Sequence, residues 1–320
     1  MINLGSLEDL QQSAAELKIL VIGCGGGGCN SVHRLTSIGI QGVKTVAINT
    51  DKSHLRTINA DQRLLIGSQV TRGLGAGGIP EVGEGCMENA LDALNKILQD
   101  ADLTFITAGL GGGTGTGVAP VVAREARKHG SLVVSMATTP FQFERGRRME
   151  AARWGIGRLN DNSDMMLLLD NNRLMDMVNH LPIEQGFGVM DQLISEMIKG
   201  LVEAVTLPSL VNIDFNDLRT IMRHKGVSTI LYGESTDPDG AVREALGNPL
   251  LEIDYEGATG ARRGGGGLAG REGQYEHQES REGTQCSLPF TGTPSGSGAL
   301  WLAPEPDIGV LILQPCLTLR

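Results

Sequence analysis

The chain from residue 17 onward alternates between two kinds of segment. Continuous apolar runs typical of buried strands lie at 18–22, 43–48, 63–66, 103–107, 132–137 and 165–169. Segments with apolar residues at helical spacing lie between several of them, at 30–38, 86–99, 118–129 and 147–159. This alternation predicts an α/β fold with a parallel sheet covered on both faces. Ligands bind such sheets at the carboxyl ends of the strands, so site residues are expected just after each strand.

Length and composition limit the class of protein. A chain of 320 residues predicts two domains. Apolar residues make up 40% and aromatic residues only 3%, so the core must be built from aliphatic side chains and Met. The net charge of -10 argues against a nucleic-acid partner, which usually meets a basic face. No run of about 18 apolar residues occurs, so no direct insertion into a membrane is expected.

The cysteines predict neither disulfides nor a metal site. Their positions show no CxxC pair and no histidine at ligand spacing: Cys24, Cys29, Cys86, Cys286 and Cys316. Residues 1–17 are polar and acidic, unlike a signal peptide. We therefore expect a cytoplasmic protein with free thiols and no bound structural metal.

A first glycine cluster, residues 23–28, follows the first predicted strand and precedes the first predicted helix. It matches the GxGxxG pattern, in which glycines let backbone N–H groups approach a pyrophosphate at a helix N-terminus. Asp51 follows the second strand and suits the acid that binds a ribose in dinucleotide sites. Taken alone, these residues fit a Rossmann-type NAD-dependent oxidoreductase or a purely structural turn.

A second glycine cluster, residues 111–117, also follows a predicted strand and opens a helix near Val118. Thr114 and Thr116 within it are expected to donate hydroxyl hydrogen bonds to phosphate oxygens. The positive end of the helix dipole adds to the attraction. Two phosphate loops at one sheet edge suit a triphosphate better than a dinucleotide. No GxxxxGK[ST] occurs, so the ordinary P-loop is excluded.

The sequence Gly-Gly-Gly-Thr-Gly-Thr-Gly at 111–117 resembles the signature loop of the tubulin/FtsZ family. Residues 46–51, 73–80 and 139–144 resemble three further nucleotide loops of that family, and the resemblance extends over 17–260. Cys24, Cys29 and residues 171–174 are most similar to archaeal members. The resemblance implies a parallel-sheet GTPase domain, a long central helix and a second α+β domain.

The resemblance also implies function and partners. It implies a GTPase that binds GTP and GDP with Mg²⁺ and polymerises head-to-tail into protofilaments of the mid-cell division ring. Membrane-tethering division proteins are the implied partners. The implied divisions are an extension at 1–16, a GTP-binding domain at 17–183, the central helix at 184–207 and a partial second domain at 208–261.

The resemblance assigns nucleotide contacts by position. The first loop supplies Gly26, Gly27, Gly28, Cys29 and Asn30, and the signature supplies Gly111, Gly112, Gly113, Thr114, Gly115, Thr116 and Gly117. Glu144 and Arg148 match contacts to ribose and phosphate. From their spacing alone they predict a surface ion pair between residues i and i+4.

Three further positions match contacts to guanine: Asn171, Asp191 and Phe187. A carboxylate at Asp191 accepts hydrogen bonds from the N1–H and amine that adenine lacks. Phe187 lies one helical turn earlier and could stack on the base, although ordinary helix packing is the better explanation without the resemblance.

The catalytic loop implied by the family lies elsewhere, at Asn212, Asp214 and Asp217. Two carboxylates three residues apart can orient a water for attack on a γ-phosphate. From the sequence alone, Asp217 as a helix N-cap and a solvated Asp214 are the simpler interpretation. The predicted helix 184–206 separates this loop from the phosphate loops, which implies catalysis in the next subunit. A GTP-binding homologue without turnover is the remaining alternative.

The family pattern stops near residue 261. Residues 262–320 are rich in Gly, Arg, Pro and Ser and are expected to be an aberrant, disordered tail. A frameshift in a GC-rich gene explains such a change, and a divergent natural tail is the alternative. The strand predicted at 228–232 would then have no sheet partners, which predicts poor polymerisation or aggregation.

Overall fold

The structure is a computed structural model that describes residues 17–144, 146–173, 183–206, 215–216, 219, 227–235, 299–302 and 308–316. The chain divides into two compact units, Met1–Pro208 and Ser209–Arg320. The expected GTP-binding domain and the long helix both fall within the first unit. No described helix is long and apolar enough to cross a membrane.

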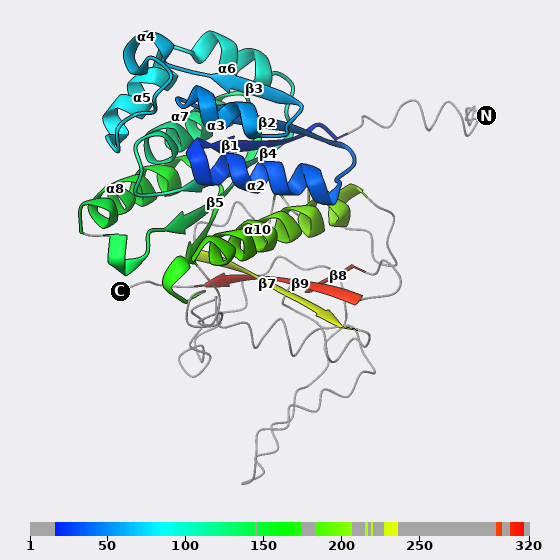
Figure 1. Ribbon diagram of the computed structural model, residues 1–320. Coiled ribbons are helices and arrows are strands. Elements are labelled where there is room, and N and C mark those ends of the chain that lie inside the picture. The colour runs from blue at the N-terminus through cyan, green and yellow to red at the C-terminus, as the bar shows by residue number, and fades with distance from the viewer. Residues whose placement is uncertain are drawn as a thin grey trace, which may run out of the picture. The chain divides into compact units, whose positions relative to one another are not determined.

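A six-stranded parallel sheet forms the centre of the first unit (Figure 1). Its strands are β1 (Ile19–Cys24), β2 (Val43–Asn49), β3 (Gln62–Leu65), β4 (Leu103–Gly109), β5 (Leu132–Thr139) and β6 (Met165–Asp170). They lie in the order β3-β2-β1-β4-β5-β6, and every pairing is parallel. The predicted α/β fold with a parallel sheet is thereby confirmed. The strand order reverses between β1 and β4, which is where such sheets bind ligands.

Helices cover both faces of this sheet. Right-handed crossovers place α2 (Gly25–Ile38) and α3 (Lys52–Thr57) on one face. The opposite face carries α5 (Pro80–Glu88), α6 (Leu91–Leu98), α7 (Thr114–Lys128) and α8 (Gly146–Asn162). Two separate buried apolar clusters correspond to the two faces. The long helix α10 (Ile183–Thr206) packs against α2 (Figure 1). Short elements α4 (Ser68–Thr71) and η1 (Gln142–Glu144) complete the unit.

Both helices that follow the glycine clusters begin earlier than their sequences predict. Helix α2 begins at Gly25 rather than residue 30, and α7 begins at Thr114 rather than Val118. Glycine is a poor helix former, so propensity favours a loop at both places. Packing against β4 and against the other glycine segment outweighs propensity here, because only a chain without Cβ atoms can approach so closely.

The helix predicted at 86–99 is two helices. Helix α5 begins at Pro80, whose fixed φ suits a first helical position. It ends at Glu88, and α6 begins at Leu91. The first turn of α5 contains Gly83, where an added Cβ would lie 2.5 Å from the Gly113 carbonyl oxygen. Gly83 thus contacts the second glycine cluster in the tertiary structure, and the sequence around it gives no indication of this contact.

The second unit contains a three-stranded sheet. Strands β7 (Val227–Ser235), β8 (Ala299–Leu302) and β9 (Ile308–Cys316) lie in the order β7-β9-β8, with antiparallel pairing throughout. The prediction that strand 228–232 would lack sheet partners is therefore wrong, and so is a tail devoid of regular structure. Pairing between segments so distant in sequence leaves no local pattern. The expected tail between 262 and 298 lies outside the described residues.

Candidate nucleotide-binding site

Two helix N-termini meet at the point where the strand order reverses. Helix α2 leaves the carboxyl end of β1, and α7 follows the adjacent strand β4, whose Ala108 pairs with Cys24. The N-cap residues are Cys24 and Gly113, and neither helix has a side-chain hydrogen bond at its cap. The first N–H groups of both helices therefore have no side-chain acceptor. Together with the helix dipoles, they form a suitable place for an anion.

Glycines let these two N-termini pack closely against each other and against neighbouring elements. A Cβ added to Gly25 would lie 2.5 Å from the backbone nitrogen of Gly115. A Cβ at Gly28 would lie 2.1 Å from the Thr107 carbonyl oxygen, and one at Gly117 would lie 2.0 Å from the Pro80 carbonyl oxygen. Gly25, Gly28, Gly115 and Gly117 are thus required by packing.

Gly26 and Gly112 differ from those glycines. A Cβ added at either position would meet nothing within 4 Å. Neither has a positive φ, so neither the backbone conformation nor packing explains glycine there. Backbone that is open on this side can accept a close ligand, as the predicted phosphate loops require.

The threonine hydroxyls of the second cluster already have partners. Thr114 Oγ1 lies 2.6 Å from Thr50 Oγ1, and both residues are buried. Thr116 Oγ1 accepts a 2.9 Å hydrogen bond from the Gly111 N–H. In this structure both hydroxyls thus have partners within the protein, and these bonds shape the loop. Thr116 accepts its bond and keeps a hydroxyl hydrogen to donate, so the contact with phosphate stays a prediction.

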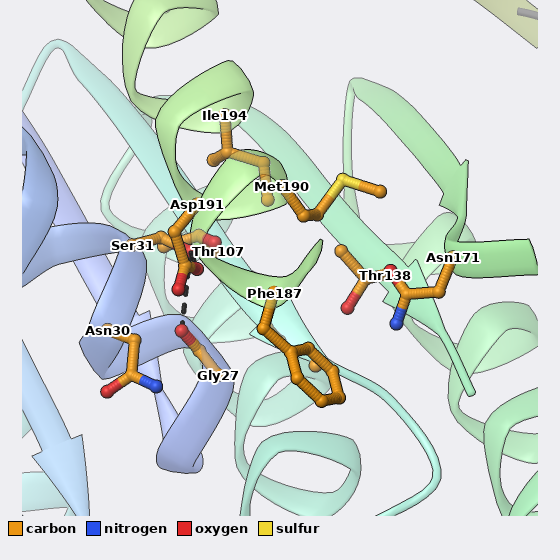
Figure 2. A pocket seen from close by; sticks show the side chains of 12 residues that line it. Gly27, Asn30, Ser31, Thr107, Thr138, Asn171, Phe187, Met190, Asp191 and Ile194 are labelled. Carbon is orange, nitrogen blue, oxygen red and sulfur yellow. Dashed lines mark hydrogen bonds between the residues drawn. The ribbon is translucent and has the colours of Figure 1, made fainter. Parts of the chain in front are cut away.

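A pocket lies beside the α2 N-terminus, between α2, α10 and the ends of β4 and β5 (Figure 2). Its volume is about 350 Å³, including space that is open to solvent. It contains five residues predicted to contact a nucleotide: Gly27, Asn30, Asn171, Phe187 and Asp191. The other lining residues are Ser31, Thr107, Ala108, Gly109, Thr138, Met190 and Ile194.

Asp191 provides the negative charge of the pocket. Its Oδ1 accepts a 2.7 Å hydrogen bond from the Ser31 hydroxyl (Figure 2). Burial raises the pKa of the Asp191 carboxyl from 3.8 to about 6, while the Ser31 bond and the Arg34 charge oppose the rise. The carboxylate thus lacks the solvation that it would have in water, and donors from a ligand would stabilise its ionised form.

Asn171 and Phe187 line the same pocket. Asn171 is 4% exposed, and its Oδ1 has no hydrogen-bond partner within the described part of the chain. A buried acceptor without a partner is costly unless a ligand supplies a donor. Phe187 is 43% exposed, and its ring meets that of Phe141 edge-on at 5.1 Å. Phe187 therefore packs against Phe141 while much of its ring stays accessible.

Glu144 and Arg148 form an ion pair, as their spacing predicts. The other carboxylate oxygen of Glu144 accepts a 2.9 Å hydrogen bond from the Phe141 N–H. Arg148 lies next to Gly111, because a Cβ at that glycine would be 2.9 Å from the Arg148 carbonyl oxygen. The pair thus borders the second glycine cluster.

Cys29 and Asp51 are occupied by structural contacts. The Cys29 thiol is buried against the carbonyl oxygens of Ile48 and Gly23, and burial raises its pKa to about 12. Its side chain cannot contact a nucleotide in this orientation, so only its backbone could. Asp51 caps α3 by accepting hydrogen bonds from the N–H groups of Ser53 and His54. The carboxylate that suited a dinucleotide ribose is therefore engaged.

The predicted catalytic residues Asn212, Asp214 and Asp217 lie outside the described residues. Three described cysteines, Cys24, Cys29 and Cys86, are free and buried. Within the described ranges, no group of three or more His, Cys, Asp or Glu residues could hold a metal ion.

Comparison with known sequences identifies the family. The profile of the tubulin/FtsZ family GTPase domain matches residues 18–179, which include both glycine clusters. The chain belongs to the tubulin/FtsZ family. This family membership replaces the dehydrogenase alternative, which rested on the first cluster and Asp51.

Archaeal FtsZ proteins are among the similar sequences, as expected. Cell division protein FtsZ 2 of Haloferax volcanii is 48% identical over 258 residues, covering 80% of this chain and 64% of the relative. FtsZ 2 of Methanocaldococcus jannaschii is 49% identical over 258 residues, covering 79% and 68%. The chain thus spans less than two thirds of the length of the Haloferax relative.

Solved structures agree with the family fold. An empty FtsZ dimer from M. jannaschii matches with a TM-score of 0.73 at 44% identity, covering 79% of this chain and 74% of that one. CetZ2 from Haloferax volcanii, described as a GTPγS-bound protofilament, matches with a TM-score of 0.62 at 26% identity, covering 69% and 67%.

Several pocket residues were not predicted from the sequence. Ser31 follows Asn30 directly, but its role depends on Asp191, which is distant in sequence. Met190 and Ile194 supply an apolar wall from α10. A buried Met or Ile on a long helix resembles any other core residue, so no sequence signal distinguishes these two.

Proposed function

We propose that the chain binds GTP and GDP at the pocket beside the α2 N-terminus. The observation that carries this proposal is the meeting of two uncapped helix N-termini beside a pocket that contains Asp191. Uncapped N-termini suit phosphate oxygens. The carboxylate suits guanine, whose N1–H and exocyclic amine are adjacent donors, whereas adenine offers no such pair.

Bound Mg²⁺ would be held chiefly through the phosphates and water, because Mg²⁺ keeps several waters and needs few protein carboxylates. The open space beside the backbone at Gly26 and Gly112 leaves room for a phosphate group. When bound, the metal ion would neutralise charge that develops on the phosphates during hydrolysis.

Hydrolysis is proposed to use Asn212, Asp214 and Asp217 of a neighbouring copy. A carboxylate would orient a water and accept its proton as the water oxygen bonds to the γ-phosphorus. The bridging bond to the β-phosphate breaks, which releases GDP and phosphate. Asp191 lies near the start of α10, and about 20 Å of helix at 1.5 Å per residue lies between it and Thr206 at the end of α10. The loop comes later in the chain, and the family resemblance favours its action on the nucleotide of another copy.

Such catalysis requires head-to-tail assembly, in which one surface of each copy meets a different surface of the next. The relatives named for cell division support a role in the division ring at mid-cell, in the cytoplasm. Membrane-tethering division proteins are proposed as partners of the polymer.

The first test measures bound nucleotide and phosphate release against protein concentration. Hydrolysis at an interface predicts that phosphate release rises more than linearly with concentration, and that sedimentable polymer forms with GTP. Bound GTP without phosphate release would instead support a structural homologue without turnover. Bound NAD, or no guanine nucleotide at all, would refute the proposal.

The second test mixes two inactive variants. Asp217→Asn lacks a proposed catalytic carboxylate, and Gly112→Val fills the proposed phosphate site. If catalysis joins two copies, an equal mixture regains activity, to about a quarter of the wild-type rate for random head-to-tail assembly. An inactive mixture, with both variants still polymerising alongside wild type, would show that each copy uses its own loop.

A further inference from the structure

Three side chains form one hydrogen-bonded row that ends at the nucleotide pocket. Asn49 Nδ2 lies 3.2 Å from His54 Nδ1, and His54 Nε2 lies 2.9 Å from Asn30 Oδ1. Asn49 is buried at the end of β2, His54 belongs to α3, and Asn30 lines the pocket. The row therefore connects a buried strand end to a pocket side chain.

Donor and acceptor roles along this row are fixed from its buried end. Asn49 Oδ1 accepts hydrogen bonds from the backbone N–H groups of Thr50 and Asp51, at 2.8 Å and 3.2 Å. Its amide oxygen must face those donors, so its nitrogen faces the histidine. His54 Nδ1 must then be an acceptor, which places the ring proton on Nε2. That N–H donates to Asn30, whose oxygen must face it.

The orientation of Asn30 follows directly. Because Oδ1 accepts from His54, the Nδ2 donors of Asn30 point elsewhere, and no acceptor in the described part of the chain takes them. Figure 2 shows the Asn30 nitrogen on the side nearer Gly27 and its oxygen on the side away from it. Asn30 is exposed. Without His54, no contact in the described part of the chain would prevent its amide from rotating by half a turn.

His54 is itself well placed to hold another residue. Its backbone N–H donates a 3.1 Å hydrogen bond to Asp51 Oδ1, which caps the helix. Its ring is bonded at both nitrogens. A ring bonded at both nitrogens, on a backbone that is itself held by Asp51, gives Asn30 a defined partner.

We propose that His54 is a positioning residue for the nucleotide site, acting through Asn30. It holds the Asn30 amide with its N–H donors towards the pocket, where they bind an oxygen acceptor of the nucleotide. This inference rests on the proposed nucleotide-binding function.

The test is a double-mutant cycle on GDP affinity in the full chain. His54→Leu removes both ring hydrogen bonds and is expected to weaken GDP binding roughly three- to tenfold, the range of one neutral hydrogen bond. In an Asn30→Ala background, His54→Leu should change affinity by less than about twofold, because the residue through which it acts is missing.

Two further variants separate positioning from folding. His54→Gln can accept from Asn49 and donate to Asn30, so it should restore affinity to within about twofold of wild type. Asn30→Asp keeps the bond from His54 but presents oxygen to the pocket, so it should bind GDP more weakly than Asn30→Ala. The matched control is His129→Leu, which removes a 3.1 Å bond to Asn95 away from the pocket and should leave affinity unchanged.

The outcomes distinguish this inference from the proposed function. Equal losses from His54→Leu in both backgrounds would overturn the inference while GDP binding by wild type upholds the site. Failure of His54→Gln to restore affinity, with its thermal unfolding unchanged, would also overturn it. Absence of GDP binding by wild type would overturn the proposed function and the inference together.

Discussion

The Ser31 hydroxyl on α2 donates a 2.7 Å hydrogen bond to the Asp191 carboxylate on α10. A second contact supports it, since the Ser195 hydroxyl lies 3.1 Å from the Ser31 carbonyl oxygen. These bonds tie the first glycine helix to the long helix at the pocket. They orient the Asp191 carboxylate, whose ionised form is destabilised by burial.

Replacing Asp191 with Asn should stabilise the nucleotide-free protein above pH 6. The folded-state pKa is raised from 3.8 to about 6, so the folded protein binds more protons than the unfolded chain between these values. Wild-type stability from this group therefore falls as pH rises through that window and stays low above it. We expect Asp191→Asn to gain roughly 1–3 kcal/mol at pH 7 and little at pH 4.

Thermal unfolding of both proteins between pH 4 and pH 8 checks this expectation. The difference in Tm should grow through the window and then level. A difference that is constant with pH would mean that the Asp191 carboxyl does not titrate there. Asp92→Asn, on the first turn of α6 and outside the pocket, is the control variant of the same chemistry.

Asp191→Asn should also change which base the proposed site prefers. Guanine presents two donors to the carboxylate, whereas xanthine presents one donor and one carbonyl acceptor. The Asn amide offers the matching acceptor and donor. The affinity of the variant for GDP should therefore fall roughly ten- to a hundredfold, and its affinity for XDP should rise. Competition between the two nucleotides measures the switch. An unchanged preference would place the base elsewhere.

Asn171→Leu should raise stability and lower nucleotide affinity together. The buried Oδ1 lacks a partner, so an apolar side chain of similar size removes an unsatisfied acceptor and should add about 1 kcal/mol. Denaturant unfolding and GDP titration measure the two effects. The neighbouring Asn172→Leu is the contrast, because Asn172 Oδ1 accepts from the Gln142 N–H at 2.7 Å and its loss should destabilise. Loss of stability in Asn171→Leu would contradict the interpretation.

Alanine substitutions should divide the glycines into two groups. Gly28→Ala and Gly117→Ala place a Cβ within 2.1 Å of backbone oxygen and should destabilise by at least roughly 2 kcal/mol. Gly26→Ala and Gly112→Ala meet open space, so stability should change by less than about 1 kcal/mol while nucleotide affinity falls. Unfolding and GDP binding, measured for all four, test the division. Normal affinity in both Gly26→Ala and Gly112→Ala would argue against phosphate contact at these backbones.

Much of the fold follows from local pattern. All six parallel strands were predicted within a few residues, because strands buried on both faces require continuous apolar runs. Helix boundaries were predicted less well where glycine was involved. The start of α7 at Thr114 and the break between α5 and α6 depend on contacts such as Gly83 with Gly113, which local propensity does not record.

The pairing of β7 with β9 shows the same limit more strongly. Residues 308–313 form an apolar run, but the sequence does not show its partner, because antiparallel pairing of distant segments depends on where the chain returns. In the site, the predicted Asn171 and Asp191 line one pocket, whereas the hydroxyls of Thr114 and Thr116 bond within the protein.

The amino-acid sequence by itself determined the parallel α/β class, the two glycine clusters at strand ends and the membership of the tubulin/FtsZ family. Those properties are encoded in residue type and spacing, which a linear chain displays directly. Only the tertiary structure decided which glycines serve packing, that Asp191 is buried against Ser31, and that the direction of the Asn30 amide is set by His54 and Asn49. These features arise where separate elements meet, because burial and hydrogen-bond direction depend on neighbours in space.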